Sequence, residues 1–304
     1  MEKLKPNALQ KGDTVAIISP SGYVSYQEKF EKAVSYFENA GYKVKIFPNA
    51  KNQNGYLAGS DEERLFDLEA AFCDRKIKMI MTSRGGYGAA RILDKIDYKI
   101  IKNNPKIFCG YSDITAFHSA IYKKTGLITF HAPFALADFG SETVDEYTER
   151  NFWKRITKND LSATENAFSY IPINAGKVTG ELIGGNLCVL TSILGSEFEP
   201  EFKNKILYIE DVNEPLYKID RMLSQLRLNG VFKEVKGVLV GGFSSEEKDF
   251  DEKVINLLNE LPVPCGYGFS ATHETSKATL PLNIRYEVDF ENGLLTPKEE
   301  YFTA

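Results

Sequence analysis

The chain has 304 residues, of which 43% are hydrophobic and 26% charged, and its formal net charge is 37 − 42 = −5. This length suits about two domains of ordinary size. The acidic balance disfavours nucleic acid and anionic membranes as partners, and no apolar run approaches a membrane span. The cysteines (Cys73, Cys109, Cys188, Cys265) are far apart, and the N-terminus lacks a signal-peptide pattern. We therefore expect a globular protein of the reducing cytoplasm.

The first half of the chain alternates between short apolar runs and segments with apolar residues at helical spacing. Strands are expected at residues 15–18, 44–47, 79–82, 107–111 and 127–130, with helices near 30–40, 60–72, 88–93 and 113–124. Ser60 and Glu63 form a capping-box pattern at the start of the second helix. Short apolar strands between helices are typical of a parallel sheet covered on both faces. Residues 1–135 are therefore predicted to form a doubly wound α/β domain, flavodoxin-like or Rossmann-like.

The second half has a different pattern. A polar connector is expected over residues 136–166, with one helix near 147–156. Residues 167–304 are predicted to form a smaller mixed α+β domain, with strands at 205–209, 237–240 and 285–290. A helix should begin at Pro215 and stop at Gly230, and another should cover 250–261. Asn292-Gly293 is typical of a hairpin turn.

Ligands of doubly wound sheets collect outside the carboxyl ends of the strands, so the loops there are the first to inspect. One of them contains Gly110-Tyr111-Ser112-Asp113, which places Ser112 between a strand and a helix. A serine at such a turn holds its hydroxyl out beside the unpaired amides of the next helix, which suit an oxyanion. The G-x-S-x-G pattern is only half met, because Ile114 replaces the second glycine. The alternative is that Ser112 is simply a helix N-cap.

A second loop, Arg84-Gly85-Gly86-Tyr87-Gly88, also lies between a strand and a helix. Its glycines allow a backbone to approach a ligand closely. The spacing matches neither a dinucleotide fingerprint nor a P-loop, so no cofactor is expected. Arg84 is a candidate partner for a substrate carboxylate or for a surface acid. A simple tight turn is the alternative.

A serine nucleophile needs a base, and the chain has three histidines. His118 lies six residues after Ser112, which on a helix is about 9 Å along the axis and too far for a hydrogen bond. His131 ends the fifth strand at the ligand edge and stays possible on geometry, as does His273 in a polar loop of the second half. No two histidines have metal-ligand spacing, so no metal is expected.

An apolar strand ends in Glu210-Asp211, whose side chains should point to opposite faces. Glu210 shares the face of Tyr208. Asp211 and Glu214 are placed to cap the helix at Pro215, which leaves Glu210 as the better candidate for the acid that orients a histidine.

Together these segments resemble the LD-carboxypeptidase family of serine peptidases, which also includes the microcin-immunity proteins. The motifs occur in family order from about residue 13 to 283: Ser19-Pro20, Arg84 to Gly88, Gly110 to Asp113, Gly184-Gly185-Asn186-Leu187, Glu210-Asp211 with Glu214-Pro215, and His273 followed by Thr279-Leu280-Pro281-Leu282.

The resemblance implies a role for each motif. Ser112 would be the nucleophile, His273 the general base and acid, and Glu210 the carboxylate that orients the imidazole. The backbone amides of Gly86 and Asp113 would be the oxyanion donors. Arg84, Gly85 and Asn186 are candidates for substrate binding. The site would then straddle the two domains, and relatives imply a homodimer.

The implied reaction is hydrolysis of an L-to-D amide at the C-terminus of a muropeptide tetrapeptide, which releases D-Ala through an acyl-enzyme. Immunity-type relatives cleave an amide in a peptidyl or aminoacyl nucleotide instead. A different class remains open, a non-catalytic module that binds a small anion at Gly85–Gly88. An oxidoreductase is disfavoured because the dinucleotide fingerprint is missing.

The chain departs from the family at three positions. Thr272 and Asn283 stand where relatives usually have glycine, and Ala132 stands where many do. We expect these departures to affect the local backbone and substrate specificity, while the three positions of the implied triad are filled.

Overall fold

The computed structural model describes residues 2–303, and the chain divides into two compact units. Unit 1 holds the residues up to Asn159, Thr279–Pro281 and those from Tyr301 onward; unit 2 holds Asp160–Ala278 and Leu282–Glu300. The division differs from the expected 1–135, 136–166 and 167–304. Most of the expected connector packs as part of unit 1, and the chain returns to unit 1 twice after residue 278.

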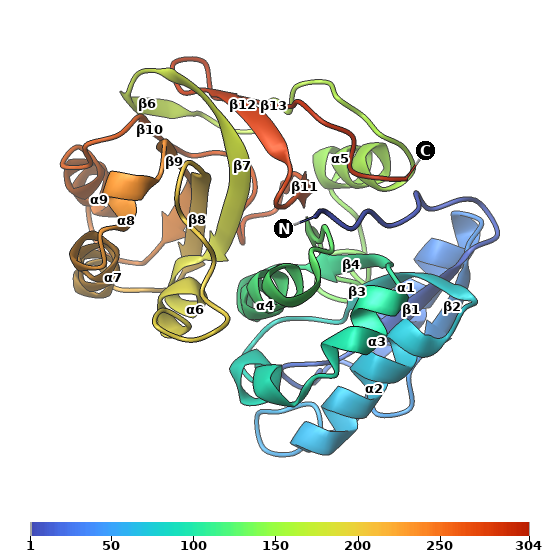
Figure 1. Ribbon diagram of the computed structural model, residues 1–304. Coiled ribbons are helices and arrows are strands. Elements are labelled where there is room, and N and C mark those ends of the chain that lie inside the picture. The colour runs from blue at the N-terminus through green and yellow to red at the C-terminus, as the bar shows by residue number, and fades with distance from the viewer. Residues whose placement is uncertain (1, 304) are drawn as a thin grey trace. The chain divides into compact units, whose positions relative to one another are not determined.

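Unit 1 contains a six-stranded sheet in the order β11-β5-β4-β3-β1-β2. Its strands are β1 (Thr14–Ile18), β2 (Lys43–Ile46), β3 (Ile77–Thr82), β4 (Ile107–Gly110), β5 (Phe130–His131) and β11 (Leu280–Pro281). The first five are parallel to their neighbours, and β11 pairs antiparallel with β5. The order 2-1-3-4-5 is that of flavodoxin-like sheets, with the change of direction between β1 and β3. The predicted α/β class is confirmed (Figure 1).

Helices of unit 1 flank this sheet. They are α1 (Glu28–Asn39), α2 (Asp61–Cys73), α3 (Tyr98–Asn103), α4 (Thr115–Thr125) and α5 (Glu146–Ile156), with 3₁₀ turns η1 (Ala89–Arg91), η2 (Leu93–Lys95) and η3 (Ser112–Ile114). The capping box of α2 is present, because Ser60 accepts from the Glu63 amide at 3.2 Å and Glu63 accepts from the Ser60 amide at 2.7 Å. Gly126 ends α4 at φ 79°, a left-handed conformation that favours glycine.

Two elements of unit 1 differ from the prediction. The helix expected at 88–93 is replaced by η1 and η2, because Gly88 has φ 142° and the Ala89 amide bonds a side chain instead of a helical carbonyl. The fifth strand was expected at 127–130, but the backbone there pairs with Leu4 of the N-terminal segment, which leaves only Phe130–His131 as β5. The short helix α3 was not expected.

Unit 2 contains a seven-stranded sheet in the order β13-β12-β7-β8-β9-β10-β6. The strands are β6 (Ile171–Asn174), β7 (Lys177–Asn186), β8 (Ile206–Val212), β9 (Gly237–Ser244), β10 (Cys265–Tyr267), β12 (Arg285–Asp289) and β13 (Leu294–Pro297). The four central strands β7 to β10 are parallel, and the outer strands are antiparallel. The mixed α+β class is confirmed; the parallel centre and strands β6, β7, β10 and β13 were not expected.

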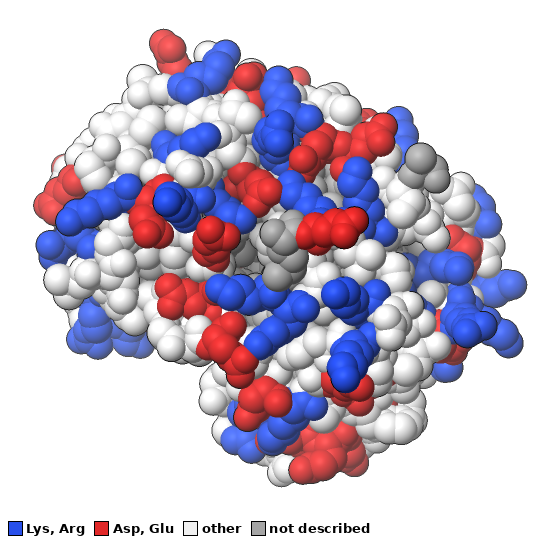
Figure 2. Space-filling view, viewed as in Figure 1, with Lys and Arg blue, Asp and Glu red and all other residues white. Residues whose placement is uncertain are grey.

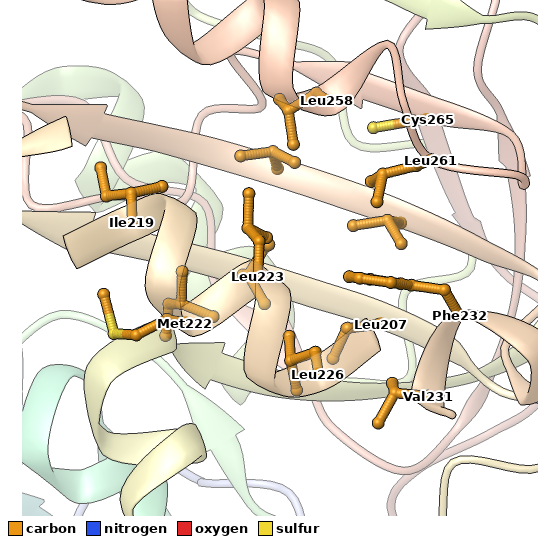
Figure 3. Close-up of a cluster of buried hydrophobic side chains, with 14 of the residues drawn as sticks. Leu207, Ile219, Met222, Leu223, Leu226, Val231, Phe232, Leu258, Leu261 and Cys265 are labelled. Atoms are coloured by element: carbon orange, nitrogen blue, oxygen red, sulfur yellow. The ribbon is translucent and has the colours of Figure 1, made fainter. Parts of the chain in front are cut away.

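Helices cover one face of the parallel strands in unit 2. They are α6 (Leu187–Ser192), α7 (Leu216–Leu228), α8 (Val231–Glu234) and α9 (Phe250–Leu258). Ile219, Leu223 and Leu226 of α7 belong to one buried apolar cluster with Leu207 and Ile209 of β8 (Figure 3). Because strand residues alternate between faces, Tyr208 and Glu210 lie on the other face, as predicted.

The surface carries both charge signs. On the face seen in Figure 2, lysines and arginines are interspersed with aspartates and glutamates. Within residues 2–303, every helix is too short or too polar to span a bilayer.

His118 offers a pH-dependent test of the fold. Burial lowers the pKa of His118 to about 4, and its Nε2 lies 2.9 Å from the Gly110 carbonyl oxygen. The unfolded chain binds a proton at this histidine near pH 6.5, before the folded chain does, so acid should weaken folding. Between pH 6.5 and 4.5 wild type should lose about 2 kcal/mol of unfolding free energy that His118→Gln keeps.

Urea unfolding followed by fluorescence of Trp153, the one tryptophan, measures this difference in unit 1. Parallel curves of unfolding free energy against pH for the two proteins would contradict the assignment.

Candidate active site

Ser112 occupies a strained turn between β4 and α4. Tyr111 is extended, Ser112 has φ 58°, and η3 then leads into the helix. A non-glycine residue in the left-handed region is held there only by its surroundings, and such strain clusters at functional sites. The alternative that Ser112 is an N-cap is wrong, because Tyr111 and Ile114 precede η3 and α4 and neither element has a side-chain cap.

The glycine loop lies directly against Ser112. A Cβ on Gly85 would stand 2.8 Å from the Ser112 Cβ and 2.9 Å from its Oγ, so no side chain fits. Gly86 has φ 105°, another conformation that favours glycine. The Gly85 carbonyl accepts from the Gly22 amide at 3.0 Å, which joins this loop to the one after β1. The glycines expected for close approach therefore meet the candidate nucleophile.

Gly85→Ala should lower catalytic activity more than it lowers the stability of unit 1. The added methyl group would force Ser112 to move, and a misplacement of about 1 Å costs on the order of 100-fold in rate. We expect kcat to fall by roughly that factor, with unfolding of unit 1, followed by Trp153 fluorescence, remaining cooperative. An unchanged kcat would show that the contact between Gly85 and Ser112 is not needed.

Arg64 ties the loops of this region together. Its side chain is buried, and Nη1 donates to the carbonyl oxygens of Pro20 at 2.6 Å and Gly88 at 2.9 Å. Nη2 pairs with Asp61 at 2.6 Å. Sequence reasoning missed Arg64, because an arginine in an amphipathic helix is normally exposed and no motif distinguishes it.

The other residues of unit 1 that the sequence analysis singled out differ in exposure and in hydrogen-bond partners. Arg84 is exposed and donates from Nη1 to the Tyr23 carbonyl oxygen at 3.3 Å. Asp113 is buried, and its carboxylate accepts from the Ala89 amide at 2.8 Å. His131 is buried in β5, where it pairs with Leu280. Ala132 is also buried, and its amide donates to the Gly110 carbonyl oxygen at 3.1 Å.

In unit 2, Glu210 and His273 form a close pair. Glu210 is fully buried on β8, and its Oε2 lies 2.6 Å from Nδ1 of His273, whose side chain is 17% exposed. A carboxylate at Nδ1 fixes the ring and its tautomer so that Nε2 is the nitrogen that takes a proton. The sequence predicted both residues, and the structure brings them together across 63 positions of the chain.

Glu210→Gln tests this pairing. Glutamine keeps the volume but removes the charge that stabilises an imidazolium and favours the wrong tautomer, so kcat should fall by ~100-fold or more with KM little changed. Glu287→Gln, at a partly exposed position of β12, is the matched control. Equal kinetics for the two variants would remove Glu210 from the mechanism.

The pairing of β8 with β9 contains a β-bulge beside Glu210. Ile209 pairs with Val240 but Asp211 pairs with Phe243, so Gly241 and Gly242 together oppose Glu210. A Cβ on Gly241 would lie 2.8 Å from the Ala271 carbonyl oxygen and 3.1 Å from Cγ2 of Thr272. The glycines thus let the loop that carries His273 approach β9.

Two of the positions where the chain departs from the family it resembles fit this backbone. Thr272 accepts from the Glu274 amide through its hydroxyl at 2.8 Å, which fixes the turn at His273. Asn283 has φ 64°, the region where glycine is usual and asparagine is the next most tolerant residue.

Asn186 and Asp211 bond to each other. The Asn186 amide donates to Asp211 at 2.8 Å, and its oxygen accepts from the Val189 amide at 3.1 Å. Asp211 also accepts from the Cys188 amide at 2.8 Å, and burial raises the pKa of Asp211 to about 6. Both residues therefore cap α6.

The prediction that Asp211 and Glu214 cap the helix at Pro215 is wrong. Glu247 accepts from the Leu216 amide at 3.0 Å, and Glu214 pairs with Lys218 at 3.2 Å.

A pocket of about 180 Å³ in unit 2 borders His273. Gly241 and Gly242 of the bulge, together with Tyr267 and Glu274, also line it. Among residues 2–303, no group of three or more histidine, cysteine, aspartate or glutamate residues could hold a metal ion.

A strained serine against a glycine loop and a buried carboxylate–histidine pair are features of hydrolases that attack a carbonyl with a serine. Comparison with known proteins also indicates a serine hydrolase. Residues 15–132 match the family model of the LD-carboxypeptidase N-terminal domain, and residues 179–288 match that of its C-terminal domain. The chain belongs to the LD-carboxypeptidase family and is a peptidase of the serine hydrolase type.

Individual relatives fall into two groups. A probable murein peptide carboxypeptidase of Bacillus subtilis is 39% identical over 92% of this chain and 90% of that protein. The microcin C7 self-immunity protein MccF of Escherichia coli is 31% identical over 97% and 96%. MccF in complex with glutamyl sulfamoyl guanosine gives a TM-score of 0.90 at 29% identity, over 99% of this chain and 100% of that one. The muramoyltetrapeptide carboxypeptidase of Oxalobacter formigenes gives 0.84 at 28%, over 95% and 100%.

Proposed function

We propose that this peptidase hydrolyses an L-to-D amide bond at the C-terminus of a muropeptide tetrapeptide and releases D-Ala. Ser112 is the nucleophile, His273 the general base and acid, and Glu210 the residue that orients His273. The contact of 2.6 Å between the buried Glu210 and Nδ1 of His273 carries this proposal most directly, because a histidine held by a carboxylate is the base a serine requires. The similarity to the Bacillus subtilis carboxypeptidase supports the substrate class.

The proposed reaction has two halves. Ser112 Oγ attacks the carbonyl carbon while Nε2 of His273 takes its proton, and the oxyanion accepts hydrogen bonds from the Gly86 and Asp113 amides. The C–N bond then breaks, and the protonated His273 gives its proton to the departing amine. In the second half, water loses a proton to His273 and attacks the acyl-enzyme. The ester bond breaks, and Ser112 regains its proton.

A second candidate is cleavage of an aminoacyl or peptidyl nucleotide at the same residues. The similarity to MccF over nearly the whole length of both chains favours it.

Paired assays separate the two candidates. The purified chain is incubated with a muropeptide tetrapeptide ending in D-Ala, with its epimer ending in L-Ala, and with glutamyl sulfamoyl guanosine. Release of alanine from the first substrate alone is the expected result. Cleavage of glutamyl sulfamoyl guanosine alone would support the second candidate, and cleavage of none of the three compounds would contradict both.

We also propose that the chain works as a cytoplasmic homodimer. Light scattering should give twice the chain mass of 34.2 kDa, and a monomeric mass across the assay concentrations would contradict the dimer.

A further inference from the structure

Asp113, which follows the proposed nucleophile, has a buried carboxylate that bonds a distant segment of the chain. Asp113 is only 4% exposed, and its Oδ2 accepts from the Ala89 amide at 2.8 Å, in a segment 24 positions away. A buried carboxylate is costly unless hydrogen bonds and charges compensate it. Arg64 provides the nearby opposite charge, and it bonds the carbonyl oxygen of Gly88, the residue just before Ala89.

These contacts fix the glycine loop at both ends. At its start, the Gly85 carbonyl accepts from the Gly22 amide at 3.0 Å, and at its end the Gly88 carbonyl accepts from Arg64 and the Ala89 amide donates to Asp113. Glycine has more backbone freedom than any other residue, so three glycines in four positions would otherwise sample many orientations. Only the peptide groups around Gly86 lie between the two anchors.

We propose that Asp113 is a positioning residue, whose side chain holds the glycine loop so that the Gly86 amide points to the same oxyanion as Asp113's own amide. This inference rests on the proposed function, in which Ser112 attacks and these two amides are the donors. Preorganised donors stabilise a transition state because they need not reorient as charge develops. One residue would thus supply one donor through its backbone and aim the other through its side chain.

Burial raises the pKa of the Asp113 carboxyl group, while the Ser21 hydroxyl, the Ala89 amide and the Arg64 charge oppose that shift. An acceptor oxygen is what the loop requires, so an uncharged amide at this position should retain much of the effect. Asp113→Asn is therefore the conservative variant and Asp113→Ala the disruptive one.

Asp67 provides the matched control. It is also a buried aspartate of unit 1, at 2% exposed, and it also accepts from a backbone amide, that of Asn49 at 3.0 Å. It lies on α2 one turn after Arg64, but both of its carboxylate oxygens bond Asn49 instead of the glycine loop. Asp67→Ala should lose stability as Asp113→Ala does, but should keep its kcat once the folded fraction is taken into account.

The experiment measures kcat and KM on the muropeptide tetrapeptide, and the rate of covalent labelling by a fluorophosphonate. Loss of one oxyanion donor typically costs ~100-fold in kcat, so Asp113→Ala should lose about that much with KM within about threefold. Asp113→Asn should recover to within about tenfold of wild type, and labelling rates should follow kcat because phosphonylation also forms an oxyanion.

Ala89→Pro removes the same hydrogen bond from the donor side, and it also strains Gly88, whose ψ of −15° is disfavoured before proline. It should reproduce the kcat loss if Asp113→Ala does not fold. Wild-type kcat in folded Ala89→Pro, or equal kcat losses for Asp113→Ala and Asp67→Ala, would overturn the inference. Absence of any Ser112-dependent hydrolysis in the wild-type chain would instead contradict the proposed function.

Discussion

Replacing Ser112 with alanine is expected to abolish hydrolysis in a chain that still folds. The hydroxyl is the proposed nucleophile, and removal of such a group typically costs ~10,000-fold or more in kcat. Ser112 caps neither η3 nor α4 and keeps a φ of 58° that alanine must also adopt. We therefore expect the unfolding free energy to change by less than about 1 kcal/mol. The measurement is kcat on the tetrapeptide, with folding of unit 1 followed by Trp153 fluorescence.

Ser119→Ala is the control for this substitution, because Ser119 lies on α4 two turns beyond the strained position. It should keep wild-type activity. More than trace turnover in Ser112→Ala would exclude Ser112 as the nucleophile, and the strained turn would then need another explanation.

Replacing His273 with alanine is expected to cost almost as much, on the order of 10,000-fold in kcat. His273 is the histidine that the structure pairs with a buried carboxylate, at 2.6 Å from Glu210. His131→Ala should cost far less activity, because His131 is buried in β5 and enters no step of the proposed reaction. Comparable losses of kcat in the two variants, at equal folded fraction, would reopen the choice of base.

The sequence predicted much of the fold because local patterns and tertiary packing agree. The apolar runs of β1, β3 and β4 are buried, and the Ser60–Glu63 capping box starts α2 where expected. Phe30, Ala33 and Phe37 form the buried face of α1, as their spacing predicts. In these elements a residue's neighbours in sequence are enough to indicate its structure.

Other elements depend on partners far away in the chain, so no local pattern marks them. Leu127 and Ile128 match the pattern of a strand, but the backbone on either side of Leu127, at Gly126 and Ile128, bonds Leu4 instead of β4. The end of the glycine loop turns into η1 because Ala89 donates to Asp113. Thr279–Pro281 returns to unit 1 because β11 pairs with β5. A strand of two residues is too short for a sequence pattern to predict this pairing.

In the candidate site, too, some residues were predicted from the sequence and others depend on distant partners. Glu210 and His273 were predicted as a pair, and their contact is present. Asn186 was expected to bind substrate, yet both polar groups of its side chain are engaged at the start of α6. Arg64 was missed because two of its three acceptors, the carbonyl oxygens of Pro20 and Gly88, come from other segments of the chain.

In the proposed reaction, Ser112 and His273 act on the same carbonyl group. The most direct measurement is a crystal structure of the chain after reaction with a fluorophosphonate, in which the modified residue is identified and its surroundings are measured. We predict phosphorus bonded to Ser112 Oγ, with Nε2 of His273 within roughly 2.6–3.2 Å of an oxygen of the adduct. An adduct on Ser112 with His273 turned away from it, or an adduct on another residue, would contradict the claim.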